Sequence, residues 1–414
     1  LKKVRAVKYR GERKILSDPL LQEAIRRRMA IVKIHSHPGG YDRFSDRDDA
    51  SDNSFFRAVT DLLEDGMPHA SAVMLPEADG FRVFARIMGG DGVIGQTDLV
   101  TVAGDDLLMW HSTMAGMPEF VRRHAQAFGA GTVSRLRQMR VAVVGCSGTG
   151  SPLISQLVRL GVGKLLLIDM DRVEWKNLNR IYMTHASDAN LARLKVDVLA
   201  EEIGRVGLGT EVACMARDVA TPEVVRAVPG CDVLFGCVDS MSARDVLNRL
   251  ATYYNLAYFD LGVQLQAAPG GGVDQVTAAV HYLQPGLSSL KSRSVYDSED
   301  VRAELLKRDD PAEYRRRRKE GYIRGVQEDR PAVISVNTLA AALAVNELLA
   351  RIHPFRNDPN GRFALQQFAL HEGFNFIKAE RDLPRCPVLA KEVGRGDVTP
   401  LLNRPDLAEG PVAA

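Results

Sequence analysis

The chain has 414 residues, a length that favours two or three domains, each with its own hydrophobic core. Hydrophobic residues make up 45% of the chain and charged residues 26%, while the formal net charge is only +2. This balance excludes a protein that relies on bulk charge to hold nucleic acid or an anionic membrane surface, and no apolar run reaches the length of a membrane span.

The cysteines and the start of the chain bear on its compartment. Five cysteines are scattered along the chain, and an odd, scattered set does not form a disulfide framework. We find no signal peptide and therefore expect a cytoplasmic protein. The chain opens on Leu1 rather than Met, so whether residues precede it stays open.

The first 95 residues alternate short strand and helix patterns. VRAVKY and AIVKIHSH are typical of strands, and DPLLQEAIRRRM between them has helical spacing. SDNSFFRAVTDLLEDG predicts a second helix, followed by the strands SAVML and FRVFARI. We predict a small α+β domain over residues 1–95, ended by the Gly- and Asp-rich stretch GGDGVIGQTD, and a linker over 96–114.

A second pattern follows. Residues 107–138 are expected to be helical, and then RVAVVG, LLLID, VACMA, DVLFGCVD and LAYFDLGV recur as strands with helices between them. This rhythm predicts an α/β domain over 115–385 with a doubly wound, mostly parallel, Rossmann-like sheet. VISVNTLAAALAVNELLARI indicates a buried helix, the charged KRDDPAEYRRRRKEG a solvated helix in a crossover region over 286–330, and residues 386–414 an extended tail.

One stretch of this domain, VAVVGCSGTGSPLISQLVRLGVGKLLLIDMD, has the strand, glycine turn, helix and strand of a nucleotide site. Gly145, Gly148 and Gly150 let the backbone approach a phosphate, and the following helix directs its amide dipoles at that charge. Asp169 ends the second strand, where a carboxylate can accept hydrogen bonds from ribose hydroxyls. These features fit NAD and ATP equally well.

Charged residues farther along favour ATP. DMDRVEWKNLNR supplies Asp171, Asn177 and Arg180, and Lys195 follows. A triphosphate with a leaving pyrophosphate carries about four charges, which Arg and Lys neutralise. CVDSMSAR places Asp239 at the carboxyl edge of the sheet, where a carboxylate can hold Mg²⁺ between phosphate oxygens. Hydride transfer needs none of these groups.

Together, GCSGTGS, LIDMDRVEWKNLNR, Lys195 and CVDSMSAR resemble the ThiF/MoeB superfamily, the adenylating fold of ubiquitin-activating enzymes, over about residues 115–350. The resemblance implies that a ubiquitin-like or sulfur-carrier protein is bound by its C-terminal glycine. Its carboxylate then attacks the α-phosphate of ATP, giving an acyl-adenylate and pyrophosphate. By position, the resemblance assigns Asp169 to the ribose, Arg180 and Lys195 to the phosphates, Asn177 to their support and Asp239 to magnesium.

The same superfamily places an arginine in a helix before the first strand, often reaching into a partner subunit's site. FVRRHAQAFG offers Arg122 and Arg123, and Arg123 is the better match. The resemblance therefore implies a homodimer in which Arg123 is catalytic.

Cysteines typical of the superfamily are missing. Two C-x-x-C pairs often hold zinc, but Ser289 and Ser292 occupy the first pair, and Cys386 with Leu389 the second. One cysteine in four positions cannot form a thiolate zinc site, so that zinc is lost. Either serine could also replace a nucleophilic cysteine, which the sequence leaves open.

No cysteine is a good thioester nucleophile either. Cys146, Cys214, Cys231 and Cys237 fall in the phosphate loop or beside strands, where cysteines are usually small core residues. Cys386, in a segment expected to be exposed, is a poor candidate. We expect the acyl group to pass to a conjugating-enzyme-like acceptor.

The first domain carries IHSHPGGYDRFSDRDD. His35 and His37 lie two apart on a strand and face the same side, and Asp48 follows at the start of a helix. Two imidazoles and a carboxylate leave one position open on tetrahedral Zn²⁺, as a hydrolytic site needs. Ser45 can cap the helix and donate to a developing oxyanion.

The spacing H-x-H-P-x₆-S-x₂-D resembles the JAB/MPN (JAMM) metalloproteases, which cut peptide or isopeptide bonds after ubiquitin-like domains. That family uses an upstream glutamate as general base. Only Glu12 and Glu23 precede His35 here, and neither has a matching context. The base lies before Leu1 or has been lost.

The two resemblances give one leading hypothesis, an ATP-dependent activating enzyme for a ubiquitin-like protein. We suggest a bacterial conjugation or antiviral system from the fusion alone. The alternatives are a JAMM-type zinc peptidase whose ThiF domain docks the partner, a sulfur-carrier-protein adenylyltransferase, and a scaffold with both sites inactive.

Overall fold

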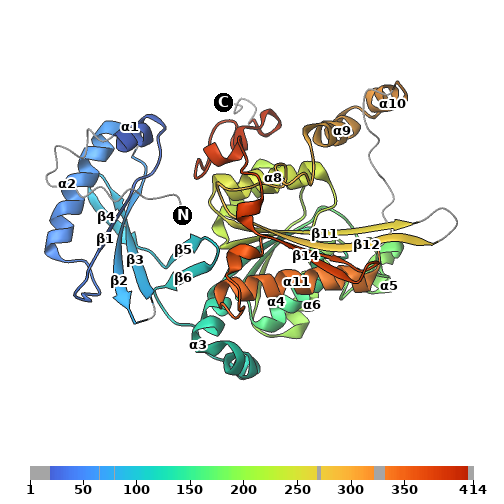
Figure 1. Cartoon of the computed structure of the whole chain (residues 1–414), viewed down its shortest axis with the longest axis horizontal. Helices are drawn as coiled ribbons and strands as arrows, with labels where there is room; N and C mark the ends of the chain where they lie inside the picture. The colour runs from blue at the N-terminus through green and yellow to red at the C-terminus, as the bar shows by residue number, and fades with distance from the viewer. Residues whose placement is uncertain (1–18, 65, 79, 268–271, 321–331, 409–414) are drawn as a thin grey trace. The chain divides into compact units, whose positions relative to one another are not determined.

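The computed structural model describes residues 19–64, 66–78, 80–267, 272–320 and 332–408. It divides into two compact units (Figure 1). The first contains Leu1–Gly104 and Leu108–Met114, and the second contains Asp105–Leu107 and Ala115–Ala414. The expected strand VRAVKY lies outside the described residues. Within them, no helix is both long and apolar enough to cross a membrane.

The first unit is built on a four-stranded sheet in the order β1-β2-β3-β4. Its strands are β1 (Val32–Ser36), β2 (His69–Glu77), β3 (Gly80–Gly89) and β4 (Gly92–Gln96). β1 runs parallel to β2, and the other pairs are antiparallel. Two helices accompany the sheet, α1 (Pro19–Arg26) and α2 (Asp46–Leu63). They meet through Leu21, Val59 and Leu63, which form a small apolar cluster.

Two sequence expectations fail after residue 89. GGDGVIGQTD was predicted to mark a boundary, but it contributes β4. The predicted linker contains a two-stranded sheet of β5 (Leu99–Ala103) and β6 (Leu107–His111), and the helix expected from residue 107 begins only with α3 (Arg122–Gln138). The reason is a period of two rather than 3.6, because Leu107 and Met109 are buried and Leu108 between them is exposed.

The second unit confirms the α/β prediction with an eight-stranded sheet in the order β14-β13-β12-β11-β10-β7-β8-β9. Parallel pairing joins β7 (Arg140–Val144), β8 (Lys164–Ile168), β9 (Glu211–Met215), β10 (Val233–Gly236) and β11 (Ala257–Ala267). Antiparallel pairing adds β12 (Val273–Leu283), β13 (Leu365–Ala369) and β14 (Phe374–Lys378). The sheet is therefore mixed, with a parallel half and an antiparallel edge.

The strand order reverses at β7. The chain passes from β7 outward through β8 to β9, and then returns to place β10 and β11 on the other side of β7. Such a switch point opens a crevice at the carboxyl ends of the strands, where ligands bind in doubly wound folds. The glycine loop follows β7 and lies at this point.

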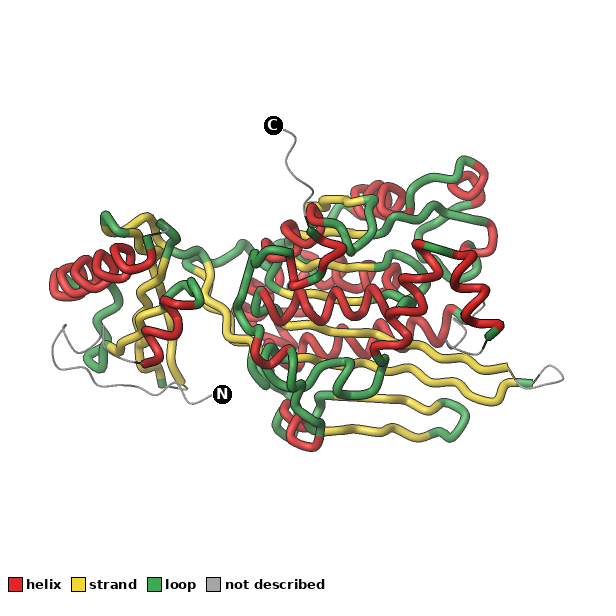
Figure 2. Tube along the Cα trace, turned by 90° about the horizontal axis from the view of Figure 1, so that it is seen from above, coloured by secondary structure: helices red, strands yellow, loops and turns green. Residues whose placement is uncertain are grey.

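Helices cover the sheet (Figures 1 and 2). α4 (Gly150–Leu160) packs on α6 (Lys195–Val206) and on α11 (Ile334–Ile352). Ala142 and Val144 of β7 join the apolar cluster of α8 (Met241–Tyr253), so α8 covers the face to which these alternate side chains point. The remaining helices are α5 (Ala186–Asn190), α7 (Pro222–Ala227), α9 (Ser298–Asp309) and α10 (Pro311–Lys319). α11 confirms the predicted buried helix, and α10 carries the charged stretch.

The tail is not extended as predicted. It forms three short 3-10 turns, η7 (Leu389–Lys391), η8 (Leu401–Asn403) and η9 (Pro405–Leu407). Leu401, Leu402 and Leu407 are buried in the same cluster as α8. The apolar side chains in LLNRPDL, spaced through a Pro-rich segment, explain why the tail folds back onto the core.

Candidate functional site

The glycine loop that joins β7 to α4 is tightly packed by its own neighbours. Gly145 has φ of 92°, a backbone conformation that favours glycine. A Cβ at Gly145 would lie 2.5 Å from the carbonyl oxygen of Cys237, and one at Gly150 would lie 1.8 Å from the carbonyl oxygen of Gly145. These two glycines are therefore required by the loop itself, before any ligand is considered.

Two side chains meet at Gly148. A Cβ there would lie 2.2 Å from Asn337 Nδ2 and 3.1 Å from Arg180 Cδ. The glycine at this position leaves room for both side chains. The structure thus brings Arg180, predicted to bind phosphate, against the loop, and it adds Asn337, which the sequence analysis did not identify.

Asp169 follows β8 and lies beside the loop. Its Oδ2 accepts from the amide of Cys146 at 2.7 Å, and its Oδ1 accepts from the amide of Asp171 at 2.9 Å. Burial raises the pKa of this carboxyl, and the charge of Lys195 with the two amide hydrogen bonds offsets only part of that rise. Each oxygen keeps a second lone pair with which it can accept from a hydroxyl.

Lys195 begins α6 and is buried. Its Nζ lies 2.7 Å from Asp171 Oδ2 and 3.8 Å from Asp169 Oδ1. The ammonium and both carboxylates predicted for the site are therefore brought together. Asp171 is the more exposed carboxylate, with 58% of its side chain accessible, so a phosphate entering the crevice would compete with it for Lys195.

The segment between β8 and α5 places the other predicted phosphate groups. Asn177 is buried in η3 (Trp175–Asn177), where its Oδ1 accepts from the amide of Glu174 at 3.0 Å. Arg180 donates from Nη1 to the carbonyl of Lys176 at 2.6 Å. Asn177 holds the turn, and the turn holds Arg180 against Gly148.

Asp239 and Arg123 are exposed. Asp239 follows β10, which pairs in parallel with β7, so it stands at the same carboxyl edge as the glycine loop. Arg123 lies in the first turn of α3, and among the described residues it forms no ion pair with Asp169, Asp171 or Asp239.

The cysteines are poor nucleophiles. Burial raises the pKa of the Cys146 and Cys237 thiols and raises that of Cys231 to about 12. Cys214 is exposed as a residue, but partial desolvation of its thiol and the nearby charge of Asp197 raise its pKa to about 11. Two expectations need correction, because Cys386 is buried rather than exposed, and Cys214 is exposed on β9 rather than a core residue. Leu389 donates its amide to Cys386 Sγ at 3.3 Å.

Hydrogen bonds join the two turns where the superfamily often holds zinc. The amide of Ser289 donates to Ser292 Oγ at 2.9 Å, and the amide of Ser292 donates to Ser289 Oγ at 3.0 Å. Ser292 Oγ in turn donates to the carbonyl of Pro384 at 2.7 Å, while Ser289 is buried. Both hydroxyls have local structural partners, which does not favour either one as a nucleophile.

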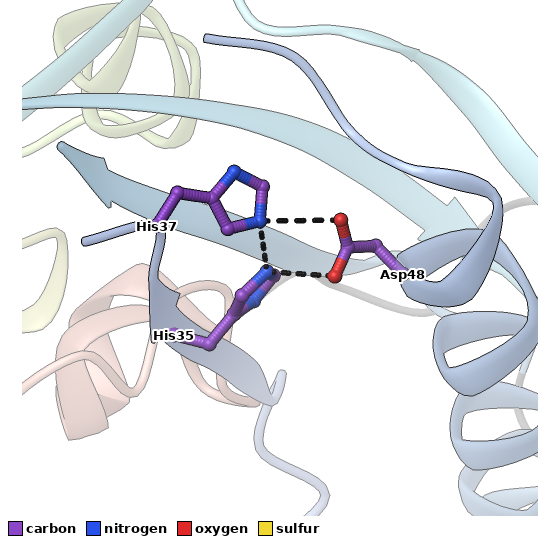
Figure 3. Close-up of side chains that lie close together, drawn as sticks. All are labelled: His35, His37 and Asp48. Carbon is purple, nitrogen blue, oxygen red and sulfur yellow. Dashed lines mark hydrogen bonds and ion pairs between the residues drawn. The ribbon is translucent and has the colours of Figure 1, made fainter. Parts of the chain in front are cut away.

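The first unit contains the histidine–aspartate cluster (Figure 3). His35 lies on β1, His37 directly follows this strand, and Asp48 lies in the first turn of α2. The distances are 3.1 Å between the two Nε2 atoms, 3.0 Å from His35 Nε2 to Asp48 Oδ1 and 3.2 Å from His37 Nε2 to Asp48 Oδ2. Ligands at about 2.0 Å in a tetrahedron are about 3.3 Å apart, so these three groups fit Zn²⁺.

Ser45 fixes the carboxylate of this cluster. It caps α2, accepting from the amide of Asp48 and donating its own amide and hydroxyl to Asp48 Oδ2 at 2.7 and 2.6 Å. Burial alone would raise the pKa of Asp48, but these hydrogen bonds and the two histidines outweigh it and hold the pKa below its ordinary value. The predicted cap is confirmed, and its hydroxyl is directed at Asp48 in this structure.

A buried ion-pair network lies behind the cluster. Asp52, fully buried one turn after Asp48, accepts from Lys33 Nζ and from Arg86 Nη2, both at 2.7 Å. Arg86 also pairs with Asp49 at 2.5 Å. Neither Asp52 nor Lys33 was predicted for the site, although their spacing is informative. Asp52 lies four residues after Asp48 on α2, and Lys33 lies two residues before His35 on β1, so each shares a face with a ligand of the cluster.

Neither glutamate upstream of His35 is placed at the cluster among the described residues. Glu12 lies outside them, and Glu23 pairs with Arg26 on α1. His35, His37 and Asp48 are the one group of described side chains arranged to hold a metal ion.

The similarity to known proteins concerns the second unit. A model of the ThiF family matches residues 121–388. Ubiquitin-like modifier-activating enzyme 5 of Culex quinquefasciatus is 26% identical, with 60% of this chain and 67% of that protein aligned. The Aedes aegypti protein of the same name is 30% identical over 37% of this chain and 38% of its own length. For the Aedes relative, the match therefore spans less than half of the protein.

Solved structures share the fold. Escherichia coli MccB in complex with MccA-N7isoASN is 18% identical with a TM-score of 0.50, covering 68% of this chain and 75% of that one. The microcin C7 biosynthetic enzyme MccB in complex with N-formylated MccA is 19% identical with the same TM-score, covering 66% and 74%. At such low identity the likeness concerns the fold alone.

Proposed function

This chain belongs to the ThiF family, and from that premise we propose that it uses ATP and Mg²⁺ to adenylate the C-terminal carboxylate of a ubiquitin-like protein. One observation carries the proposal: Arg180 and Lys195 approach the glycine loop at the switch point of the sheet, beside Asp169. Two cationic side chains, together with a magnesium ion that Asp239 would hold, suit a triphosphate better than the diphosphate of NAD.

The residues divide the reaction between them. The partner's carboxylate oxygen bonds to the α-phosphorus of ATP, and the bond from that phosphorus to the oxygen of the leaving pyrophosphate breaks. Arg180 and Lys195 neutralise the charge that develops, Lys195 exchanging Asp171 for phosphate. Asp169 accepts from the ribose. Asp239 would hold the magnesium ion, which screens the pyrophosphate.

The acyl group needs an acceptor from elsewhere. The four cysteines with raised pKa values hold few thiolates near neutral pH, and Cys386 is buried. We propose transfer from the adenylate to a cysteine of a conjugating-enzyme-like protein. The exposed Arg123 would complete the site of a second copy, which makes the working form a homodimer.

ATP–pyrophosphate exchange tests this proposal. The full chain is incubated with ATP, Mg²⁺, labelled pyrophosphate and candidate ubiquitin-like proteins with or without their C-terminal glycine. We expect exchange only with the intact tail. Exchange with no candidate, combined with stabilisation against heat by NAD and not by ATP–Mg²⁺, would contradict it.

The cluster of the first unit supports a second candidate function. His35, His37 and Asp48 would hold zinc, which when bound supplies a Lewis acid and a water of lowered pKa. We propose a JAMM-type peptidase for the same partner's tail that lacks its base in the described residues. Cleavage of a tail-extended partner tests it, and we expect slow cleavage or none from this chain. Brisk, chelator-sensitive cleavage would show that the base is present.

A further inference from the structure

The first turn of α11 reaches the glycine loop. Asn337 is the fourth residue of this helix, and its Nδ2 occupies the place that a Cβ of Gly148 would need, 2.2 Å away. α11 packs along α4, the helix that follows the loop. The side chain is 4% exposed, so it is held inside the protein at the point where the loop and Arg180 meet.

The side chain of Asn337 makes no hydrogen bond within the described residues, and its amide keeps some accessible surface, since it is not among the buried side-chain atoms that lack a partner. Its neighbours differ. Ser151 Oγ accepts from the amide of Tyr182 at 2.9 Å, and the Thr338 hydroxyl bonds to the Ile334 carbonyl at 2.7 Å. The donor of Asn337 therefore makes no bond inside the protein and lies beside Gly148 and Arg180, where a ligand entering the crevice can accept from it.

The surroundings define the charge of that partner. Asn337 lies beside the cationic Arg180 and against the loop whose amide of Cys146 already donates to a carboxylate. It also stands in the first turn of a helix of 19 residues, whose dipole favours an anion there. Helix dipole, guanidinium and amide donor all suit a phosphate oxygen.

We propose that Asn337 binds the nucleoside triphosphate, donating from Nδ2 to a phosphate oxygen next to Arg180. The inference rests on the proposed function, because it assigns a further ligand to the ATP of the adenylation reaction. It also gives Gly148 a reason: a side chain there would displace the donor.

Binding of ATP–Mg²⁺ and of adenosine to the full chain, measured by calorimetry without any protein partner, tests the proposal. Asn337→Asp keeps the shape, removes the donor and adds a negative charge beside the phosphates. A hydrogen bond to a charged group contributes about 1.5–3 kcal/mol, so we expect ATP–Mg²⁺ affinity to fall about 10- to 100-fold with adenosine affinity unchanged. Asn346→Asp is the matched control, because Asn346 is exposed on the same helix and donates to Ala342.

The possible outcomes distinguish the assignment of Asn337 from the proposed adenylation function on which it rests. Wild-type ATP affinity in Asn337→Asp overturns the inference alone, and so does an equal loss for adenosine and ATP, which indicates a structural role. Asn337→Leu, of similar size, replaces the aspartate variant if that variant does not fold, and it should lose about 10-fold. A wild-type chain that binds no ATP contradicts the proposed function itself. Competition by a free carboxylate peptide but not by inorganic phosphate would assign Asn337 to the partner's tail and overturn the phosphate assignment.

Discussion

The two candidate sites are held in place in different ways. In the second unit, backbone geometry positions the site: the glycine loop at the switch point of the sheet determines where Arg180, Asp169 and Lys195 lie. In the first unit, side chains position the site: ion pairs of Asp52 on α2 with Lys33 on β1 and with Arg86 on β3 hold the helix to two strands of the sheet. A site fixed by backbone geometry leaves a sequence signature that a family model detects, whereas a site of three ligands leaves a short spacing.

The electrostatics differ as well. At the glycine loop, burial raises the pKa of Asp169, and the charge of Lys195 with two amide hydrogen bonds offsets only part of that rise. At the cluster, hydrogen bonds keep the pKa of Asp48 low while burial lowers that of His35, so the carboxylate is ionised and the imidazole neutral near pH 7. Both are the protonation states that zinc binding needs.

The largest effect is expected from removing the proposed magnesium ligand in the second unit. Asp239→Ala should reduce pyrophosphate exchange about 10²- to 10³-fold, because a magnesium ligand that neutralises the leaving group is removed. Arg180→Ala should behave similarly. Asp358→Ala, which removes an exposed carboxylate paired with Arg362 in the same unit, is the control. Normal exchange in either site variant would refute the assignment.

Metal content tests the histidine–aspartate cluster of the first unit. The full chain should hold about one zinc, measured by mass spectrometry of the dialysed protein, and His37→Ala should hold none, because two ligands remain. Acid should release the metal as the histidines become protonated. His371→Ala, in the second unit, should keep the zinc. A wild-type chain without zinc would contradict the ligand assignment.

The ion pairs behind the cluster should matter for stability in the first unit alone. Asp52→Asn should destabilise it by about 3 kcal/mol, because Lys33 and Arg86 are left partly unpaired at a buried position. Hydrogen exchange of β1, β3 and α2 in the full chain measures this, with Asp61→Asn on the exposed face of α2 as control.

The contribution of Asp52 to the stability of the first unit should also depend on pH. Burial alone would raise the pKa of Asp52, but hydrogen bonds from Lys33 and Arg86 and the charge of Lys33 outweigh it and lower the pKa below the ordinary 3.8. The carboxylate therefore stabilises the fold above pH 3.8, and that contribution is lost as the pH falls through the lowered pKa. The difference between Asp52→Asn and wild type should shrink in acid. A constant difference would show that the charge is not responsible.

The smallest effect is expected from removing the hydroxyl of Ser45, which caps α2 beside the cluster. Ser45→Ala removes a helix cap and one hydrogen bond to Asp48, so the first unit should lose about 1 kcal/mol while zinc content stays near one per chain. Thermal unfolding with Ser54→Ala, an exposed serine of the same helix, provides the reference. Loss of the zinc would mean that Ser45 is essential for positioning the carboxylate.

Much of this could be predicted from the sequence, and the failures have physical causes. The strands around the glycine loop are short apolar runs between clear turn signals, and the capping box of α2 is legible in SDRD. The exposure of Cys386 was predicted wrongly because burial of a Pro-rich tail depends on leucines that return to a distant helix. Asn337 could not be identified, since it lies far from Gly148 along the chain and meets it only through the packing of α11 on α4.

The paired serines at 289 and 292 have a practical consequence. Because hydrogen bonds join these turns, we expect the second unit to keep its structure without a bound transition metal. A zinc-selective chelator, used with magnesium in excess, should then affect only the first unit. Any response to it reports on His35, His37 and Asp48, and pyrophosphate exchange serves as the internal standard.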